Sequence, residues 1–265
     1  MSGKNPFLGL GFGSPFTTFA RLVSGGASVI SDGLLMHLDA GDTNSYSGSG
    51  TIWTDLSGNG NNATLEGFGG GGGPTYSSGN GGYFDFDGTN DYVNVSSNTV
   101  LPYGTNSFTF SVWIYIDIIS GSWGPNHKSN LLFSGNASGR VECGIFAAGN
   151  TAGPPSFIRL ARYGGGTSGT CDVNVSMNTS AWYNVTIVRD GVSSQKIYQD
   201  GVQIGTGNVS NSFNQATMKM FGGTDNGSNF SGFHDGRVAN VLMYNKALTA
   251  SEVLQNYDAL KGRYS

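Results

Sequence analysis

The stretch at residues 83–95, YFDFDGTNDYVNV, constrains the fold of this chain more than any other. Phe84 and Phe86 alternate with acidic residues, which is the period-2 pattern of a strand with one buried face. The alternation resumes at Asp91 after GTN, a sequence that tolerates the backbone of a tight turn. The stretch therefore predicts a hairpin, and the strand predicted at 108–116 would add a third antiparallel neighbour.

The remaining chain repeats short strand patterns separated by turn signals, and it ends in one helix. Residues 117–130 are interpreted as an extended loop. Thr249 and Glu252 fit a capping box, and an apolar stripe at helical spacing follows them. This order predicts an all-β fold, an antiparallel β-sandwich with a short C-terminal helix. The other predicted strands lie at 33–38, 140–147, 156–162, 171–176, 182–189, 195–199, 202–204, 218–221 and 237–244.

Composition excludes several classes of partner. The net charge of −4 gives no electrostatic attraction to nucleic acid or anionic lipid. No run of 18 apolar residues predicts membrane insertion. Charged residues make up only 11% of the chain, which fits either a β protein rich in turns or a multimer whose subunits cover much of its surface. Cys143 and Cys171 have no metal-type spacing, so we expect two buried free thiols.

Residues 1–31 differ from the rest and are treated as a separate N-terminal arm, with the main domain at 32–265. Apolar side chains lie among glycines there with no helical or strand period, and the glycines interrupt any secretory signal. Such a segment needs another surface to cover it, either its own domain or a different subunit. We expect a docking arm that contacts other subunits through Phe7, Leu10, Phe12, Phe16 and Phe19.

Several motifs together resemble one known superfamily. They are GLLMHLDAGDTNSYSGSGTIWTDLSGNGNNATL at 33–65, FDFDGTNDYVNV at 84–95, SFTFSVWIY at 107–115, WYNVTIVRDG at 182–191 and GRVANVLMYNKALTASEVLQNYDALKGRYS at 236–265. This order resembles the laminin-G-like, concanavalin A-like lectin/glucanase superfamily. The resemblance implies a jelly roll of two curved antiparallel sheets. The opening and closing motifs also look like domains of bacteriophage virion proteins, although such modules occur in bacterial surface proteins too.

Members of that superfamily include enzymes, calcium-dependent lectins and adhesion domains, so individual residues must decide between them. Glycoside hydrolysis needs two carboxyl groups across the scissile bond. The three glutamates Glu66, Glu142 and Glu252 are far apart in sequence, and none has a paired acid at the enzymes' spacing. We therefore expect a protein that is not an enzyme.

Two kinds of binding site remain open. Calcium prefers carboxylate and amide oxygens, and Asp55, Asp87 and Asp91 are candidate ligands. The alternative is that these carboxylates cap turns of the backbone. The departure from the family at Ala239 and Asn240, where relatives often carry an acid, counts against calcium. For a glycan, the candidate contacts form one group on the 117–130 loop, and the other three tryptophans are expected in the core. That group is Trp123, His127 and Lys128.

The sequence as a whole favours a non-enzymatic bacteriophage structural protein on the particle surface, such as a capsid decoration protein. Its arm would hold it to other virion proteins, it would be multimeric in the particle, and it would offer a surface for host glycans. No coiled coil or fibrous repeat is present to build a fibre trimer. The alternatives are a soluble carbohydrate-binding module of a bacterial surface or secreted protein, and an adhesion domain of a tail fibre or spike.

Overall fold

The structure is a computed structural model of the chain. It describes residues 27–264 except for short gaps at 96, 98–99, 101–103, 120–121, 124–125, 135–139, 148–151, 164–168, 193, 210–211, 214–217 and 225–229. The predicted arm residues Phe7, Leu10, Phe12, Phe16 and Phe19 lie outside the described part of the chain. Within that part, no helix combines the length and apolarity needed to cross a membrane.

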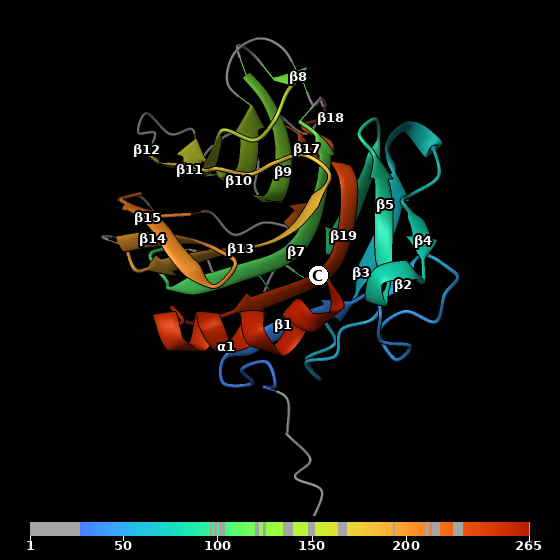
Figure 1. The fold of residues 1–265 in the computed structure, drawn as a ribbon, viewed down its shortest axis with the longest axis horizontal. Coiled ribbons are helices and arrows are strands. Elements are labelled where there is room, and N and C mark those ends of the chain that lie inside the picture. Colours follow the sequence, from blue (N-terminus) through green and yellow to red (C-terminus); the bar gives the residue numbers. More distant parts are fainter. Residues whose placement is uncertain are drawn as a thin grey trace, which may run out of the picture.

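Two antiparallel sheets face each other (Figure 1). Sheet 1 contains β1 (Leu34–Asp39), β4 (Thr75–Ser77), β5 (Tyr83–Asp87), β7 (Phe108–Ile118), β13 (Ala181–Asp190), β14 (Ser194–Gln199), β15 (Val202–Gly207) and β19 (Asp235–Tyr244). Across the sheet, the described strands run β15-β14-β13-β7-β19-β5-β4, and β1 also pairs with β19. The predicted antiparallel β-sandwich is therefore confirmed.

Sheet 2 lies on the other side of the core. It contains β2 (Ile52–Trp53), β3 (Ala63–Gly67), β6 (Asp91–Val95), β8 (Ser122–Trp123), β9 (Asn126–Ser134), β10 (Arg140–Ala147), β11 (Phe157–Tyr163), β12 (Gly169–Asn174) and β16 (Met218–Met220). Its described order is β12-β11-β10-β9-β16-β6-β3-β2, with β8 on β9. The remaining elements are η1 (Phe68–Gly70), η2 (Gly79–Gly81), the pair β17 (Gly223–Thr224) and β18 (Phe230–Ser231), α1 (Ala250–Leu260) and η3 (Lys261–Arg263).

The main core fills the space between the two sheets. Alternate side chains of β7, such as Phe110 and Ile114, point into it and meet residues of sheet 2 such as Val93 and Ile145. Cys143 and Cys171 are both buried, and neither forms a disulfide, as predicted. Burial raises the pKa of both thiols, that of Cys171 to about 11, so they are inert at neutral pH.

The hairpin predicted at residues 83–95 is wrong, although both of its strands exist. β5 pairs with β4 and β19 in sheet 1, whereas β6 pairs with β3 and β16 in sheet 2. The turn between them therefore crosses from one sheet to the other, and β7 pairs with β13 and β19 instead of β6. Alternation buries Phe84 and Val93 between the sheets in this arrangement, so the same pattern fits a crossover and a hairpin equally.

The extended loop predicted at 117–130 is also wrong in its second half, because β9 begins at Asn126 and lies in the middle of sheet 2. Its polar side chains hid the strand pattern, yet they are buried. Lys128 Nζ donates to Glu142 Oε1 at 2.9 Å, and Ser129 Oγ lies 2.8 Å from His234 Nδ1. Burial of these polar groups is tolerated because each finds a polar partner.

A second, smaller core lies on the outer face of sheet 1, where helix α1 covers it (Figure 1). Thr249 and Glu252 form the predicted capping box at the start of the helix. Val253 and Leu260 are buried against outward-facing residues of sheet 1, including Leu242. After Leu260 the helix tightens into the 3₁₀ turn η3.

Candidate functional site

The segment that follows helix α1 is anchored to sheet 1 by a forked ion pair. Arg263 donates to the two carboxylate oxygens of Asp39 at 2.6 and 2.7 Å, and to the carbonyl of Gly81 at 2.6 Å. Burial alone would raise the pKa of Asp39, but the hydrogen bonds and charge of Arg263 outweigh burial and hold that pKa below its usual value. Because two parallel bonds fix orientation as well as charge, Tyr264 is held next to the sheet.

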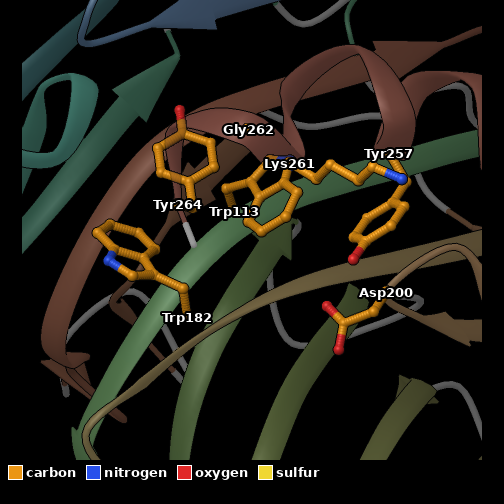
Figure 2. Close-up of a pocket in the computed structure, with 7 residues that line it drawn as sticks. All are labelled: Trp113, Trp182, Asp200, Tyr257, Lys261, Gly262 and Tyr264. Carbon is orange, nitrogen blue, oxygen red and sulfur yellow. The ribbon is translucent and has the colours of Figure 1, made fainter.

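A cavity of about 360 Å³ opens beside this anchored segment (Figure 2). Its size falls within the range of small-molecule sites. Its walls come from β7, β13, the turn between β14 and β15, helix α1 and the final turn of the chain. We call it the aromatic pocket, and its lining residues are Trp113, Trp182, Asp200, Tyr257, Lys261, Gly262 and Tyr264.

Aromatic rings form a continuous row through the pocket. Trp113 stacks on Tyr257 with ring centroids 5.5 Å apart and planes at 14°. On its other side Trp113 contacts Tyr264 at 4.6 Å, and Tyr264 contacts Trp182 at 5.0 Å. Trp113 is almost fully buried and Trp182 is half-buried. The pocket therefore offers aromatic surface that is held in place by packing on the second core.

Two charged groups stand at the rim of the pocket. Asp200 and Gly201 both have positive φ, 51° and 77°, as in a type I′ turn, and the Asp200 carboxylate accepts a hydrogen bond from the Asn184 amide at 2.8 Å. In Figure 2 this carboxylate faces the hydroxyl of Tyr257. Burial raises the pKa of Asp200 above its usual value. Lys261 Nζ lies 5.4 Å from the Tyr257 ring centroid and 2.7 Å from Asp258 Oδ1.

Three polar atoms of the pocket residues have no hydrogen-bond partner among the described residues. They are the indole nitrogens of Trp113 and Trp182 and the hydroxyl of Tyr264. Buried donors are normally paired. These three atoms are themselves buried, so the groups that the pocket offers to a ligand are its aromatic faces, the Asp200 carboxylate and the Lys261 amine. That set suits a ligand with an apolar face and a hydroxylated edge.

The predicted calcium ligands are divided between two turns. Asp55 accepts four hydrogen bonds, from the amides of His37, Ser57 and Asn61 and from the Ser57 hydroxyl. Asp87 and Asp91 do come together at the β5–β6 crossover, where Asp91 accepts from the Asp87 amide at 3.1 Å. No group of three or more His, Cys, Asp or Glu side chains in the described chain could hold a metal ion. Calcium binding stays a prediction.

The predicted glycan contacts lie around β8 and β9, on the sheet opposite the aromatic pocket. Trp123 and Asn126 are partners at the end of the β8–β9 pair, and His127 faces Ser122 there. The side chains of Trp123 and His127 are outside the described part of the structure. Lys128 is buried in its ion pair with Glu142, so its amine faces the protein interior. The role of this group also stays a prediction.

Sequence reasoning did not find the aromatic pocket. The sequence places Trp113 and Trp182 in the core, and it gives Tyr257 and Asp200 only as part of an apolar helix stripe and of a turn between strands. Each assignment is locally reasonable, because these residues do pack or turn where expected. The available signal was β7 itself, in which Trp113 and Tyr115 stand on the face opposite the apolar run and therefore need something to cover them.

Comparison with known families identifies the superfamily of this chain. The sequence profile of the concanavalin A-like lectin/glucanases superfamily, of the laminin-G type, matches residues 87–254, which is more than half of the chain. The chain belongs to this superfamily. No curated protein matches the sequence. The lectin/glucanase profile runs from the end of β5 to the first turn of α1, and so it includes the strands that carry Trp113 and Trp182 and the turn that carries Asp200.

Solved structures with a similar concanavalin A-like fold include several binding domains. Domain 4 of AbnA, an extracellular GH43 arabinanase from Geobacillus stearothermophilus solved in complex with arabinotriose, matches with a TM-score of 0.60 and 18% identity, over 84% of this chain and 98% of that one. Botulinum neurotoxin type C, whose cell entry depends on two ganglioside molecules, matches with 0.61 and 17%, over 87% and 52%. The binding domain of Paraclostridial Mosquitocidal Protein 1 matches with 0.60 and 16%, over 86% and 52%.

The present chain thus spans about half the length of the two toxin chains and nearly all of the arabinanase domain. Sequence identities this low establish a shared fold and nothing finer.

Proposed function

We propose that this chain is a carbohydrate-binding module without catalytic activity, and that the aromatic pocket is its binding site. The observation that carries the proposal is the row of ring faces beside a carboxylate at the rim. A sugar ring has an apolar C–H face, which packs on an aromatic ring, and a rim of hydroxyls, which bond carboxylates, amines and indole N–H groups. Trp182 would supply the face and Asp200 the acceptor.

The likeness to glycan-binding domains supports this assignment as a class of function. Fold alone does not fix function, but both the arabinanase domain and the toxin are described with a carbohydrate ligand. The aromatic faces and the carboxylate of the pocket suit the same class of ligand.

The proposed lack of catalytic activity is argued from the positions of the three glutamates. Glu142, the glutamate carried by a central strand, is fully buried and bonded to Lys128, so substrate cannot reach it. Glu66 bonds Tyr92 and Asn94, and Glu252 caps helix α1. None of the three faces a second carboxyl group across the aromatic pocket, which glycoside hydrolysis requires.

The test is glycan-array screening of the wild-type chain, followed by titration calorimetry of the best ligand with three variants. Trp182→Ala should weaken binding by about tenfold or more, roughly 1.4 kcal/mol, and Asp200→Asn should weaken it as well. Phe68→Ala, an exposed aromatic on η1 far from the pocket in sequence, is the matched control and should bind like the wild type. Undiminished binding by Trp182→Ala would remove the aromatic pocket from consideration.

For the setting in which the module works, we retain the sequence-based proposal of display on a bacteriophage particle, with the arm at 1–31 as its attachment. What supports it is the apolar composition of the arm. Its described end lies on helix α1, where Ile30 donates its amide to Asn256 Oδ1 at 2.8 Å and Ser28 O accepts from Gln255. Electron microscopy of purified particles carrying a labelled chain tests this, and unlabelled particles would refute it.

A further inference from the structure

The aromatic row does not stop at the pocket. Trp182 has rings on its other side too, with Tyr115 at 5.6 Å and Tyr83 at 6.0 Å between centroids, both edge-on. These two tyrosines are half-buried, and they stand on the outer face of sheet 1 beyond the pocket that helix α1 helps to form. Trp182 is therefore the junction between the aromatic pocket and a second aromatic surface.

Strand register places this second surface in a straight line across the sheet. Trp182 on β13 is opposite Tyr115 on β7, Tyr115 is opposite Arg237 on β19, and Arg237 is opposite Asp85 on β5. Neighbouring strands are about 4.8 Å apart, so the three steps cover roughly 14 Å. That is the length of a few sugar units in an extended chain.

The chemistry along this line repeats that of the pocket. The Arg237 guanidinium lies over the ring of Tyr115 at 4.3 Å and over that of Tyr83 at 5.1 Å. It is 4.0 Å from the Asp85 carboxylate, a loose contact, and its Nε has no hydrogen-bond partner among the described residues. That Nε is buried, whereas the Arg237 side chain as a whole is 27% exposed and that of Asp85 is 48% exposed. The line thus offers ring faces, a partly exposed guanidinium and a half-exposed carboxylate to hydroxyl groups.

The charges select the class of ligand. Asp200 stands at one end of the combined surface, and Asp85 with its neighbour Asp117 stands at the other. Arg237 is offset by Asp85, and Lys261 is paired with Asp258. Burial raises the pKa of Asp85, the charge of Arg237 opposes the rise, and the charge of Asp117 adds to it. An acidic sugar would meet net repulsion here, whereas neutral hydroxyls would meet acceptors.

We propose that the line Trp182, Tyr115, Arg237 and Asp85, with Tyr83 beside it, is a second subsite, so that the ligand is a neutral linear oligosaccharide lying from the aromatic pocket across the outer face of sheet 1. This inference rests on the proposed function. It adds that affinity grows with chain length, because units beyond the first lie on Tyr115 and Tyr83. The ligand class is neutral glycan chains, and single sugars and acidic chains bind more weakly.

The test uses the whole chain and calorimetric titration with ladders of one to several units of arabino-, xylo- and cello-oligosaccharides, with oligogalacturonides as the acidic ladder. Wild-type affinity should rise about tenfold or more between the shortest and the longest bound neutral ligand, with little dependence on salt because the ligand carries no charge. Tyr115→Ala should abolish most of this gain while leaving the affinity for the shortest ligand unchanged. Trp182→Ala should weaken ligands of every length, and Phe68→Ala should change neither.

Asp85→Ala is a second variant for the case in which Tyr115→Ala does not fold. The Asp85 side chain is about half exposed, at 48%, so its removal leaves the rings packed. It too should reduce only the gain with length. Equal affinity for short and long chains, with both still dependent on Trp182, would overturn the second subsite and spare the proposed function. Stronger binding of the acidic ladder would also overturn the second subsite. Lack of binding to every ladder would overturn both proposals.

Discussion

Protonation of one buried histidine should make this fold sensitive to mild acid. His234 is fully buried between the rings of Phe86 and Phe221. Its Nε2 lies 3.2 Å from the carbonyl of Tyr115, which can only accept, so Nε2 carries the proton and Nδ1 accepts from Ser129. Desolvation lowers its pKa from 6.5 to about 4, even though backbone hydrogen bonds oppose the shift.

The size of the effect follows from that shift. Below pH 6.5 the unfolded chain takes up a proton that the folded chain refuses, so stability is lost as the pH falls from 6.5 towards 4. At about 1.4 kcal/mol for each pKa unit, the total loss is on the order of 3 kcal/mol. Asp91 has the opposite effect on stability. Burial raises its pKa to about 6, so its protonation on acidification removes a buried charge and stabilises the folded state.

Urea unfolding of the wild type and of His234→Gln, at about pH 7 and about pH 4.5, measures the histidine term alone. The glutamine variant should be the less stable protein at neutral pH, since it loses ring packing. Its deficit should shrink by roughly 2–3 kcal/mol at the lower pH, because glutamine does not titrate. Asp91 is present in both proteins and cancels in the difference. A deficit that is the same at both pH values would refute the reasoning.

Three further predictions concern the anchoring of the helix and its final turn. Asp39→Asn should cost about 2 kcal/mol of unfolding free energy and loosen glycan binding, since Arg263 loses its charged partner; chemical unfolding and calorimetry measure the two effects, and an unchanged affinity would contradict the anchoring role. Gly41→Ala should prevent folding or lower stability by several kcal/mol, on the order of a severe core defect, because a methyl group would overlap the Gly81 carbonyl and the Arg263 guanidinium; a near-native melting temperature would count against this. Thr249→Ala should cost about 1 kcal/mol through loss of the helix cap, which Thr249→Ser should restore in the same melting experiment.

The sequence predicted strands far better than it predicted their partners. Alternation shows which residues of a strand are buried, and so 140–147 and the terminal helix were placed correctly. It does not show which strand lies alongside. At the β5–β6 turn the same alternation is satisfied by a hairpin within one sheet and by a crossover between two, and only the long-range pairing of β5 with β19 distinguishes them.

Buried polar residues account for the missed strand, and distance along the chain accounts for the missed pocket. Lys128 and Glu142 lie 14 positions apart, and neither is apolar, so no periodicity could reveal that they share a buried site. The aromatic pocket joins Trp113, Trp182 and Tyr264, which are brought together by the register of β7 with β13 and by the return of the chain along α1. Such a site exists only once the whole sandwich has formed.

The fork between Arg263 and Asp39 joins the first strand of the sandwich to the last turn of the described chain. Tyr264 is next in sequence to Arg263 and lies in the wall of the pocket. Local unfolding of this turn and release of a bound ligand are therefore thermodynamically coupled. A bound glycan should therefore slow amide exchange in η3 and the end of α1 more than in the central strands. Deleting the residues Gly262 to Tyr264 should therefore abolish glycan binding while the sandwich still folds.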